Sequence, residues 1–228
     1  MQSLLEFLSI RLQQPLPHDN IDNEGIPFQL LELLKKAQGR AKNMMQEHPP
    51  KICAVMIAFY EINNELFVPM MLRPIKSRVH PNQVAFPGGK REEGDQDLKD
   101  TAIREMEEEI GINVPKSQVI GQLTPVFIPP SNALVTPIIG YLTQKPNYIP
   151  SPDEVAEVLD VKITDLRNPN NMNIHKAVIS KDDAIDMPAY KANGKVIWGG
   201  TARMITELNK LLYEFDKQYK PKPFFDIK

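Results

Sequence analysis

The sequence contains one cysteine, Cys53, among 228 residues, so the chain cannot form an internal disulfide bond. It also lacks a long apolar run, because the longest, Ile52 to Tyr60, is far too short to cross a bilayer. Positive charge is not in excess, since the formal net charge is -2 at pH 7. The N-terminus has neither the basic start nor the apolar core of a signal peptide. We therefore expect a cytoplasmic protein that binds neither nucleic acid nor membrane, with Cys53 as a small buried hydrophobe.

The first half of the chain alternates helix and strand signals. Helical periodicity is expected over residues 1–14 and about 28–47, separated by a loop rich in Pro, Asn and Asp. The runs ICAVMIAFYE and ELFVPMMLR are typical of two strands, and Asn63-Asn64 between them predicts a hairpin. FPGGK is expected to be a turn. A helix is predicted from about Asp97 to Ile110, with Gly111 as its C-cap.

The second half continues the alternation. Strands are expected in SQVIGQLTPVF and ALVTPIIGYL, a short acidic helix in SPDEVAEVLD, and a hairpin around Asn193-Gly194. A helix in GTARMITELNKLLYEFDKQ closes the chain. This order predicts an α+β fold with mixed strand pairing. We expect an N-terminal helical extension over residues 1–49 packed on the core, a main domain over 50–219 and a Pro-rich tail over 220–228.

The predicted central helix carries four glutamates in five positions, in the stretch IREMEEEIGI. At about 100° per residue, Glu105, Glu108 and Glu109 share one face, whereas Glu107 points away from them. The apolar residues of the stretch lie on the other side, where they can pack on a sheet. The helix therefore presents three converging carboxylates to one side of the protein.

Converging carboxylates repel one another, and a bound divalent cation removes that cost. Hard oxygen ligands without nearby Cys or His favour Mg²⁺ or Mn²⁺ over zinc. Arg104 precedes the cluster and can pair with one carboxylate to fix its orientation. The alternative is an ordinary solvated acidic face with no ligand.

The segment GGKREEGDQDLKDTAIREMEEEIGI resembles the signature of the Nudix hydrolases, G-x5-E-x7-R-E-U-x-E-E-x-G-U, where U is a bulky apolar residue. The residues matching its second half are Arg104, Glu105, Met106, Glu108, Glu109, Gly111 and Ile112. The first half departs from it, because Asp95 stands in place of the Glu and one extra residue precedes Arg104.

The resemblance implies an α/β/α sandwich with a mixed sheet and a catalytic loop–helix–loop. It also implies hydrolysis of a nucleoside diphosphate linked to another moiety. Glu105, Glu108 and Glu109 would be metal ligands for Mg²⁺ or Mn²⁺, the Gly89 carbonyl a further ligand, and Arg104 the residue that orients the carboxylates.

The upstream segment MMLRPIKSRVHPNQVAFPGGK resembles an additional motif of the coenzyme A diphosphatase branch of that family. The agreeing residues are Arg73, Arg78, Val84, Phe86, Pro87, Gly88 and Gly89, and the departures are Met71, Ser77 and Asn82. The Asp95 spacing also agrees with this branch. The resemblance implies hydrolysis of coenzyme A or its thioesters to 3′,5′-ADP and 4′-phosphopantetheine or its acylated form. The substrate-binding residues would be Arg73, Lys76, Arg78, His80, Phe86 and Gly88.

Other readings of the upstream segment stay open. It can be a solvated basic loop that balances local acidity, and His80 can be a loop residue without a role. The enzyme can act on another nucleotide such as ADP-ribose, or the domain can be a non-catalytic Nudix-like binding module. The three retained carboxylates argue against the last alternative.

One further carboxylate is expected from outside the signature, as a metal ligand or general base. Glu154 and Glu157 lie three positions apart in the predicted acidic helix, so both can face the same way, and Glu157 is slightly favoured. For Glu154 the alternative is an acid that stabilises a helix N-terminus. The resemblance also leads us to expect a homodimer with a small-molecule nucleotide substrate.

Overall fold

The computed structural model describes residues 1–16, 49–180 and 183–219. The predicted helix over about 28–47 and the Pro-rich tail from Lys220 lie outside these residues. The helices are α1 (Gln2–Arg11), α3 (Leu98–Ile110), α4 (Ile163–Arg167) and α5 (Gly199–Tyr219), with 3-10 turns at Lys116–Gln118, Pro129–Ser131 and Pro169–Asn171. The strands are β1 (Lys51–Ile62), β2 (Glu65–Leu72), β3 (Val84–Ala85), β4 (Gly88–Lys90), β5 (Val119–Gln122), β6 (Val126–Ile128), β7 (Ala133–Tyr141), β8 (Glu157–Lys162), β9 (Met172–Ser180), β10 (Asp183–Ala192) and β11 (Lys195–Trp198).

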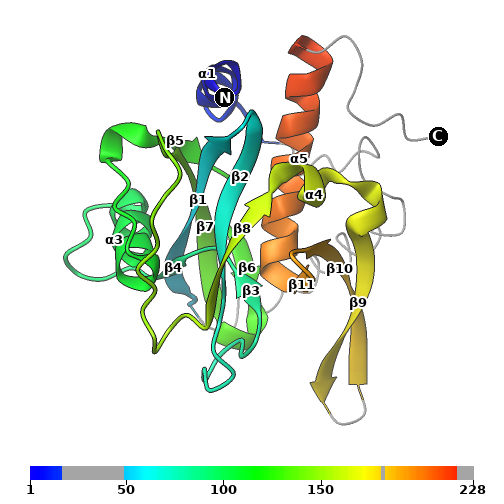
Figure 1. Ribbon diagram of the computed structural model, residues 1–228. Coiled ribbons are helices and arrows are strands. Elements are labelled where there is room, and N and C mark those ends of the chain that lie inside the picture. The colour runs from blue at the N-terminus through cyan, green and yellow to red at the C-terminus, as the bar shows by residue number, and fades with distance from the viewer. Residues whose placement is uncertain (17–48, 181–182, 220–228) are drawn as a thin grey trace.

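The main sheet is mixed, as predicted. Its path runs β3-β2-β1-β7-β5, while β4 pairs with β1, β6 with β7 and β8 with β2. The long pairing of β1 with β7 is parallel, and the other pairings in this sheet are antiparallel. A separate three-stranded sheet has the order β11-β10-β9 and lies beside α5 (Figure 1).

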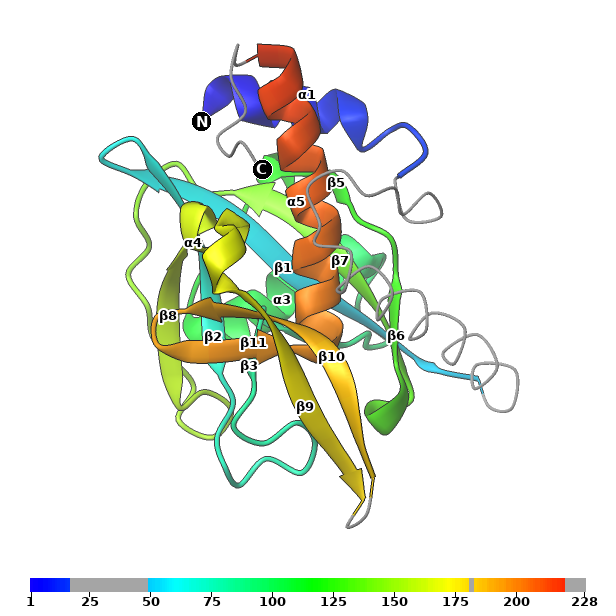
Figure 2. The same cartoon turned by 90° about the vertical axis from the view of Figure 1, so that its right-hand side faces the viewer.

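The main sheet lies between α3 on one face and α5 on the other, which is the predicted α/β/α arrangement (Figures 1 and 2). Side chains of β1 alternate between these faces. Met56 and Tyr60 pack with Met106 of α3, whereas Ile57 and Phe59 join the core on the α5 side. The sheet therefore holds α3 by its apolar stripe and leaves the glutamate side of that helix toward β4.

Helix α1 packs beside the C-terminal half of α5 (Figure 2). Phe7 is buried in the core on the α5 side, and its ring centroid lies 5.5 Å from that of Phe215. Arg11 Nε donates to Glu214 Oε2 over 2.5 Å. The division into an extension over 1–49, a Nudix domain over 50–219 and a tail stays a prediction. Among the described residues, no helix is long and apolar enough to span a membrane.

The local signals at turns and helix ends are confirmed. Asn63 and Asn64 adopt positive φ angles of 51° and 63° between β1 and β2. Asp97 is the N-cap of α3, and its side chain accepts bonds from the backbone N–H groups of residues 99 and 100. Gly111 ends α3 with a φ of 75°, a left-handed conformation that glycine adopts without strain.

Two local predictions are wrong. Residues 151–156 form a turn and no helix, and Glu157 begins strand β8 opposite Leu72 of β2. Pairing with β2 decides this conformation, because strand formation depends on a partner that helical spacing does not reveal. The predicted FPGGK turn contains instead the short strand β4, in which Gly89 pairs with Ala54.

Candidate active site

Glu109 is the most buried carboxylate of α3, with only 2% of its surface exposed. Its Oε2 accepts a 2.7 Å hydrogen bond from the backbone N–H of Gly88, and Arg73 Nη1 lies 3.8 Å from its Oε1. Burial raises the pKa of Glu109 to about 8, although the Gly88 bond and the Arg73 charge oppose the rise. The neighbours of Glu109 therefore offset only part of the cost of burying its negative charge, and a bound cation would stabilise it.

Glu105 lies against the backbone of β4. A Cβ atom added at Gly89 would stand 2.5 Å from the Glu105 carboxylate, so only glycine allows this approach. Burial raises the pKa of Glu105, while the charge of Arg104 lowers it. The Glu105 carboxylate and the Gly89 backbone are thus close together, as they must be if both are to bind one metal ion through oxygen.

Arg104 ties the helix to the loop before it. Its Nε and Nη2 donate to the two oxygens of Asp95, each over 3.1 Å. Its Nη1 donates to Glu105 Oε1 at 3.0 Å and to Glu108 Oε2 at 2.9 Å. Glu108 is half exposed, and Glu107 turns away from the cluster to accept a bond from Asn113, as its helical position predicts. Arg104 is thus placed to orient the carboxylates.

Asp95, which departs from the general signature but agrees in spacing with the coenzyme A diphosphatase branch, is the residue that holds Arg104 in place. Its buried carboxylate accepts bonds from Arg104, from Thr101 Oγ1 at 2.8 Å and from the Glu92 backbone N–H at 2.9 Å. These bonds, led by that of Arg104, hold the Asp95 pKa well below its usual range. Asp95 has a shorter side chain than the Glu of the signature and lies in a loop that is one residue longer, and its carboxylate still reaches Arg104.

We expect Asp95→Asn to lower the free energy of unfolding by about 2 kcal/mol at pH 7, because hydrogen bonds to a charged group are lost. The folded pKa of Asp95 is depressed, so its contribution is complete above about pH 4 and is lost as the pH falls toward the folded value. Denaturant unfolding at pH 7 and pH 3 measures both effects. A deficit of equal size at the two pH values would contradict this assignment.

The donor set fits a divalent cation by its chemistry. Glu105 and Glu109 are both largely buried. Besides burial, the charges of Glu108 and Glu154 raise the pKa of Glu105, and those of Glu105 and Glu154 raise the pKa of Glu109. Within residues 1–16, 49–180 and 183–219, no group of three or more His, Cys, Asp or Glu side chains is arranged to hold a metal as it stands. Arg104 bridges Glu105 and Glu108 through one oxygen of each carboxylate.

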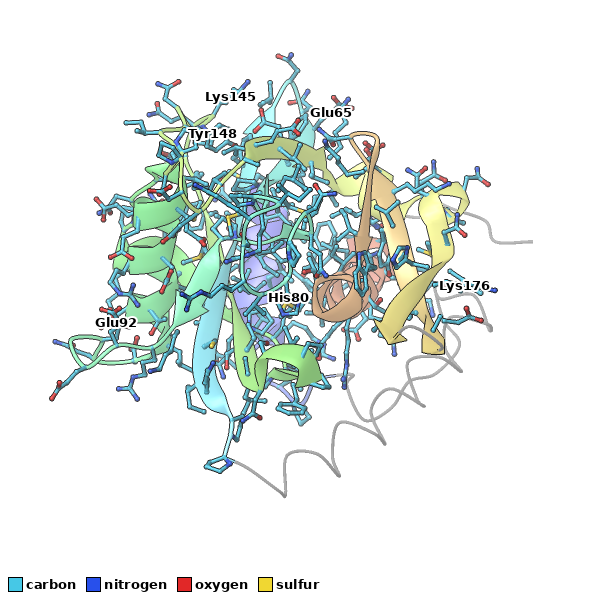
Figure 3. All side chains as sticks on the ribbon, turned by 90° about the horizontal axis from the view of Figure 1, so that it is seen from below. Glu65, His80, Glu92, Lys145, Tyr148 and Lys176 are labelled. Carbon is cyan, nitrogen blue, oxygen red and sulfur yellow. The ribbon has the colours of Figure 1, made fainter. Side chains whose placement is uncertain are left out.

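The basic loop after β2 reaches this cluster through Arg73. The Arg73 Nε is buried and has no hydrogen-bond partner in the described part of the chain. Lys76 forms a 2.8 Å ion pair with Asp153, and Arg78 is exposed. His80, labelled in Figure 3, lies 3.4 Å from Ser131 Oγ, and burial lowers its pKa.

Two predicted substrate contacts have other positions. Phe86 is 1% exposed and belongs to the core, so it packs beneath the site and does not face a ligand. Gly88 contributes its N–H to Glu109, and a Cβ there would stand 2.3 Å from the Ala54 carbonyl oxygen. Gly88 is therefore required by the close approach of β4 to β1.

Glu154 and Glu157 do not share a face. Glu157 lies on the α5 side of β8 with Leu159 and Val161, and it pairs with Lys195 over 2.9 Å. Glu154 lies in the turn just before β8, where its charge contributes to the raised pKa values of Glu105 and Glu109. The geometry therefore turns Glu157 away from the cluster, whereas the charge of Glu154 acts on it, and the identity of the further carboxylate stays a prediction.

Comparison with known proteins connects this arrangement to a family. The protein-family model described as NUDIX domain matches residues 51–182. The mitochondrial coenzyme A diphosphatase NUDT8 of Mus musculus is 31% identical over 170 residues, covering 72% of this chain and 79% of that protein. The peroxisomal coenzyme A diphosphatase NUDT7 of Mus musculus is 34% identical over 110 residues, covering 48% of this chain and 46% of that protein. Nudix hydrolase 15, mitochondrial, of Arabidopsis thaliana is 34% identical over 171 residues, covering 72% of this chain. The chain spans 60% of that plant protein.

Proposed function

This chain belongs to the Nudix hydrolase family, and from this premise we propose that it hydrolyses the diphosphate bond of coenzyme A or its thioesters. The products are 3′,5′-ADP and 4′-phosphopantetheine or its acylated form. One observation carries the choice of substrate: Arg73 of the upstream basic motif lies 3.8 Å from Glu109, inside the carboxylate site. The similarity to two coenzyme A diphosphatases supports the same choice.

In the proposed reaction, water attacks one phosphorus and the bond from that phosphorus to the bridging oxygen breaks. Glu105, Glu108 and Glu109, with the Gly89 carbonyl, would hold Mg²⁺ or Mn²⁺. A bound divalent ion supplies positive charge against the phosphate oxygens and lowers the pKa of water. Arg104 orients the carboxylates, and Glu154 accepts the proton of the attacking water or adds a further oxygen ligand.

Arg73, Lys76, Arg78 and His80 are the proposed substrate-binding groups. Coenzyme A carries a 3′-phosphate in addition to its diphosphate, and guanidinium groups bind phosphate oxygens in a bidentate manner. Arg78 is exposed and therefore accessible for this contact. Selectivity for coenzyme A over nucleotides without that phosphate then follows from the loop, while the carboxylates provide the reaction common to the family.

A screen of coenzyme A, an acyl-coenzyme A, ADP-ribose and NADH with Mg²⁺ or Mn²⁺ tests the proposal, with products identified by mass. We expect 3′,5′-ADP from the first two and little turnover of the others. Hydrolysis of ADP-ribose with coenzyme A left intact would reject the substrate class and leave a Nudix hydrolase of another nucleotide. A homodimer, which sedimentation can detect, remains part of the proposal.

We expect Arg78→Gln to raise KM for coenzyme A about tenfold, the usual scale for one lost charge-assisted contact. The KM for dephospho-coenzyme A, which lacks the 3′-phosphate, should change less than twofold. Lys176→Gln is the matched control, because Lys176 is an exposed base on β9 that lies well away from His80 in Figure 3. Equal increases for both substrates would show that Arg78 does not recognise the 3′-phosphate.

A further inference from the structure

Residues 142–156 connect β7 to β8 without regular structure, yet two backbone hydrogen bonds join them to α3. The N–H of Ile149 donates to the carbonyl of Ile110 at 2.9 Å, and the N–H of Ser151 donates to the carbonyl of Glu109 at 2.8 Å. Carbonyls in the last turn of a helix have no intrahelical donor. This connection therefore caps α3 directly at the residue that carries the buried carboxylate.

The same connection leads to Glu154. The carbonyl of Ser151 accepts from the N–H groups of Glu154, at 3.2 Å, and Val155, at 2.9 Å. Val155 is buried among the residues that pack against α3. The position of Glu154 relative to Glu109 is thus set by a short turn that begins at the α3 cap.

One side chain anchors the start of this path. Tyr148 donates from its hydroxyl to Asp160 Oδ1 at 2.5 Å, and its oxygen lies 3.2 Å from the hydroxyl of Tyr60. Tyr60, fully buried in β1, also donates to Asp160 Oδ1. Lys145 Nζ lies 3.4 Å from Asp160 Oδ2, and Figure 3 shows Lys145 and Tyr148 on the same side of the molecule.

The hydroxyls of Tyr60 and Tyr148 stay protonated at neutral pH and can both donate hydrogen bonds. Burial, followed by the bond to Asp160, raises the pKa of both Tyr60 and Tyr148. Because hydrogen bonds are directional, two hydroxyls that donate to the same carboxylate oxygen fix the positions of both tyrosine side chains. Two apolar side chains could pack in several arrangements. The cluster therefore provides positional accuracy to a segment that has no helix or sheet bonds of its own along residues 143–150.

We propose that Tyr148, held by Asp160 and Tyr60, is a positioning residue that fixes the position of Glu154 relative to Glu105 and Glu109. It touches neither substrate nor metal and acts through the backbone of residues 149–154. Its kinetic effect rests on the proposed function, but its hold on the connection does not. The three anchors come from different parts of the fold, namely β1, the connection and β8.

Tyr148→Phe removes only the hydroxyl, and Tyr213→Phe is the matched control. Tyr213 lies on α5, and its described contact is that of its ring with Lys217 Nζ, which phenylalanine keeps. We expect Tyr148→Phe to lower kcat about tenfold with KM changed less than twofold, the scale found for groups that orient catalytic ligands. Tyr213→Phe should leave both values unchanged.

A double variant separates positioning from general loss of stability. If Tyr148 acts through Glu154, then Tyr148→Phe combined with Glu154→Gln should be no slower than Glu154→Gln alone. If instead the losses of kcat from the two substitutions multiply in the double variant, the proposal is overturned. Asp160→Asn, which removes the shared acceptor charge without changing side-chain size, should reproduce the kinetic pattern and provides a second route to the same test.

Hydrogen exchange supplies a readout that needs no substrate. The Ser151 amide should exchange about tenfold faster in Tyr148→Phe than in the wild type, with amides of β1 unchanged. Unchanged Ser151 exchange would overturn the proposed hold of Tyr148 on the connection. Faster exchange in a protein that hydrolyses none of the nucleotides would support that hold and reject the proposed function instead.

Discussion

Glu109→Gln should lower kcat by about two to three orders of magnitude, the loss expected when a group that supports transition-state charge is removed. The same substitution should stabilise the metal-free protein at pH 8. Glutamine has nearly the same size and can still accept the hydrogen bond from Gly88, so the fold keeps its contacts. What disappears is a buried negative charge that Arg73, 3.8 Å away, only partly offsets.

The stability effect has a defined pH dependence. Glu109 has a folded pKa of about 8, above the ordinary value of about 4.3, so the folded protein keeps a proton that the unfolded chain releases. The free energy of unfolding of the wild type therefore falls as the pH rises from about 4 through 8. Glu109→Gln cannot ionise, so its advantage should be absent at pH 4 and largest at or above pH 8. Thermal unfolding in a chelator at both pH values measures this difference.

Glu107→Gln is the matched control, because Glu107 lies on the same helix but bonds to Asn113 away from the cluster. It should retain wild-type kcat and the wild-type pH dependence of stability. Added Mn²⁺ should raise the melting temperature of the wild type and of Glu107→Gln, and much less that of Glu109→Gln. Undiminished turnover in Glu109→Gln would remove Glu109 from the proposed metal site.

Features that depend on near neighbours in the chain were predictable. The apolar stripe of α3, its start near Asp97 and its end at Gly111 are encoded within about 15 residues, and each is found in the structure. The separation of Glu107 from the other three glutamates also follows from helical geometry alone. These features depend on backbone periodicity, which does not require knowledge of the rest of the fold.

Features that depend on pairing between distant parts of the chain could not be predicted from the sequence. Glu157 lies in a strand because β8 pairs with β2, some 85 residues earlier in the sequence numbering. Tyr60 and Tyr148 are 88 residues apart, and Tyr60 and Asp160 are 100 apart, so no local pattern connects them. Asp95 is intermediate: its position in the signature was visible, but its bonds to Arg104 required the path of the loop.

The predicted basic loop shows the same limit in a different form. Its charge and its place before the carboxylate helix were visible in the sequence, yet the individual roles of its residues were not. Arg73 enters the site, Lys76 pairs with Asp153, and Phe86 is in the core. A motif thus identifies a segment, while strand alternation and chain reversal decide which of its side chains reach the ligand.

Gly89→Ala should lower kcat about a hundredfold while leaving the fold intact, on the same several-kcal/mol scale of lost charge stabilisation. The added Cβ would stand 2.5 Å from the Glu105 carboxylate, which is the end of a flexible side chain and can move away. Its movement breaks the 3.0 Å bond to Arg104 Nη1 and takes the carboxylate from the site. Steady-state kinetics and thermal unfolding together measure the two effects.

Two neighbouring glycines make the result specific. Gly94→Ala should be active, because a Cβ at Gly94 meets nothing within 4 Å. Gly88→Ala should fail to fold stably, because its Cβ would collide with the backbone of β1. Alanine preserves the carbonyl of residue 89, so the loss in Gly89→Ala reports on Glu105. Gly89→Ala combined with Glu105→Gln should then be no slower than Glu105→Gln alone, and a further multiplicative loss would assign the role to the residue 89 backbone.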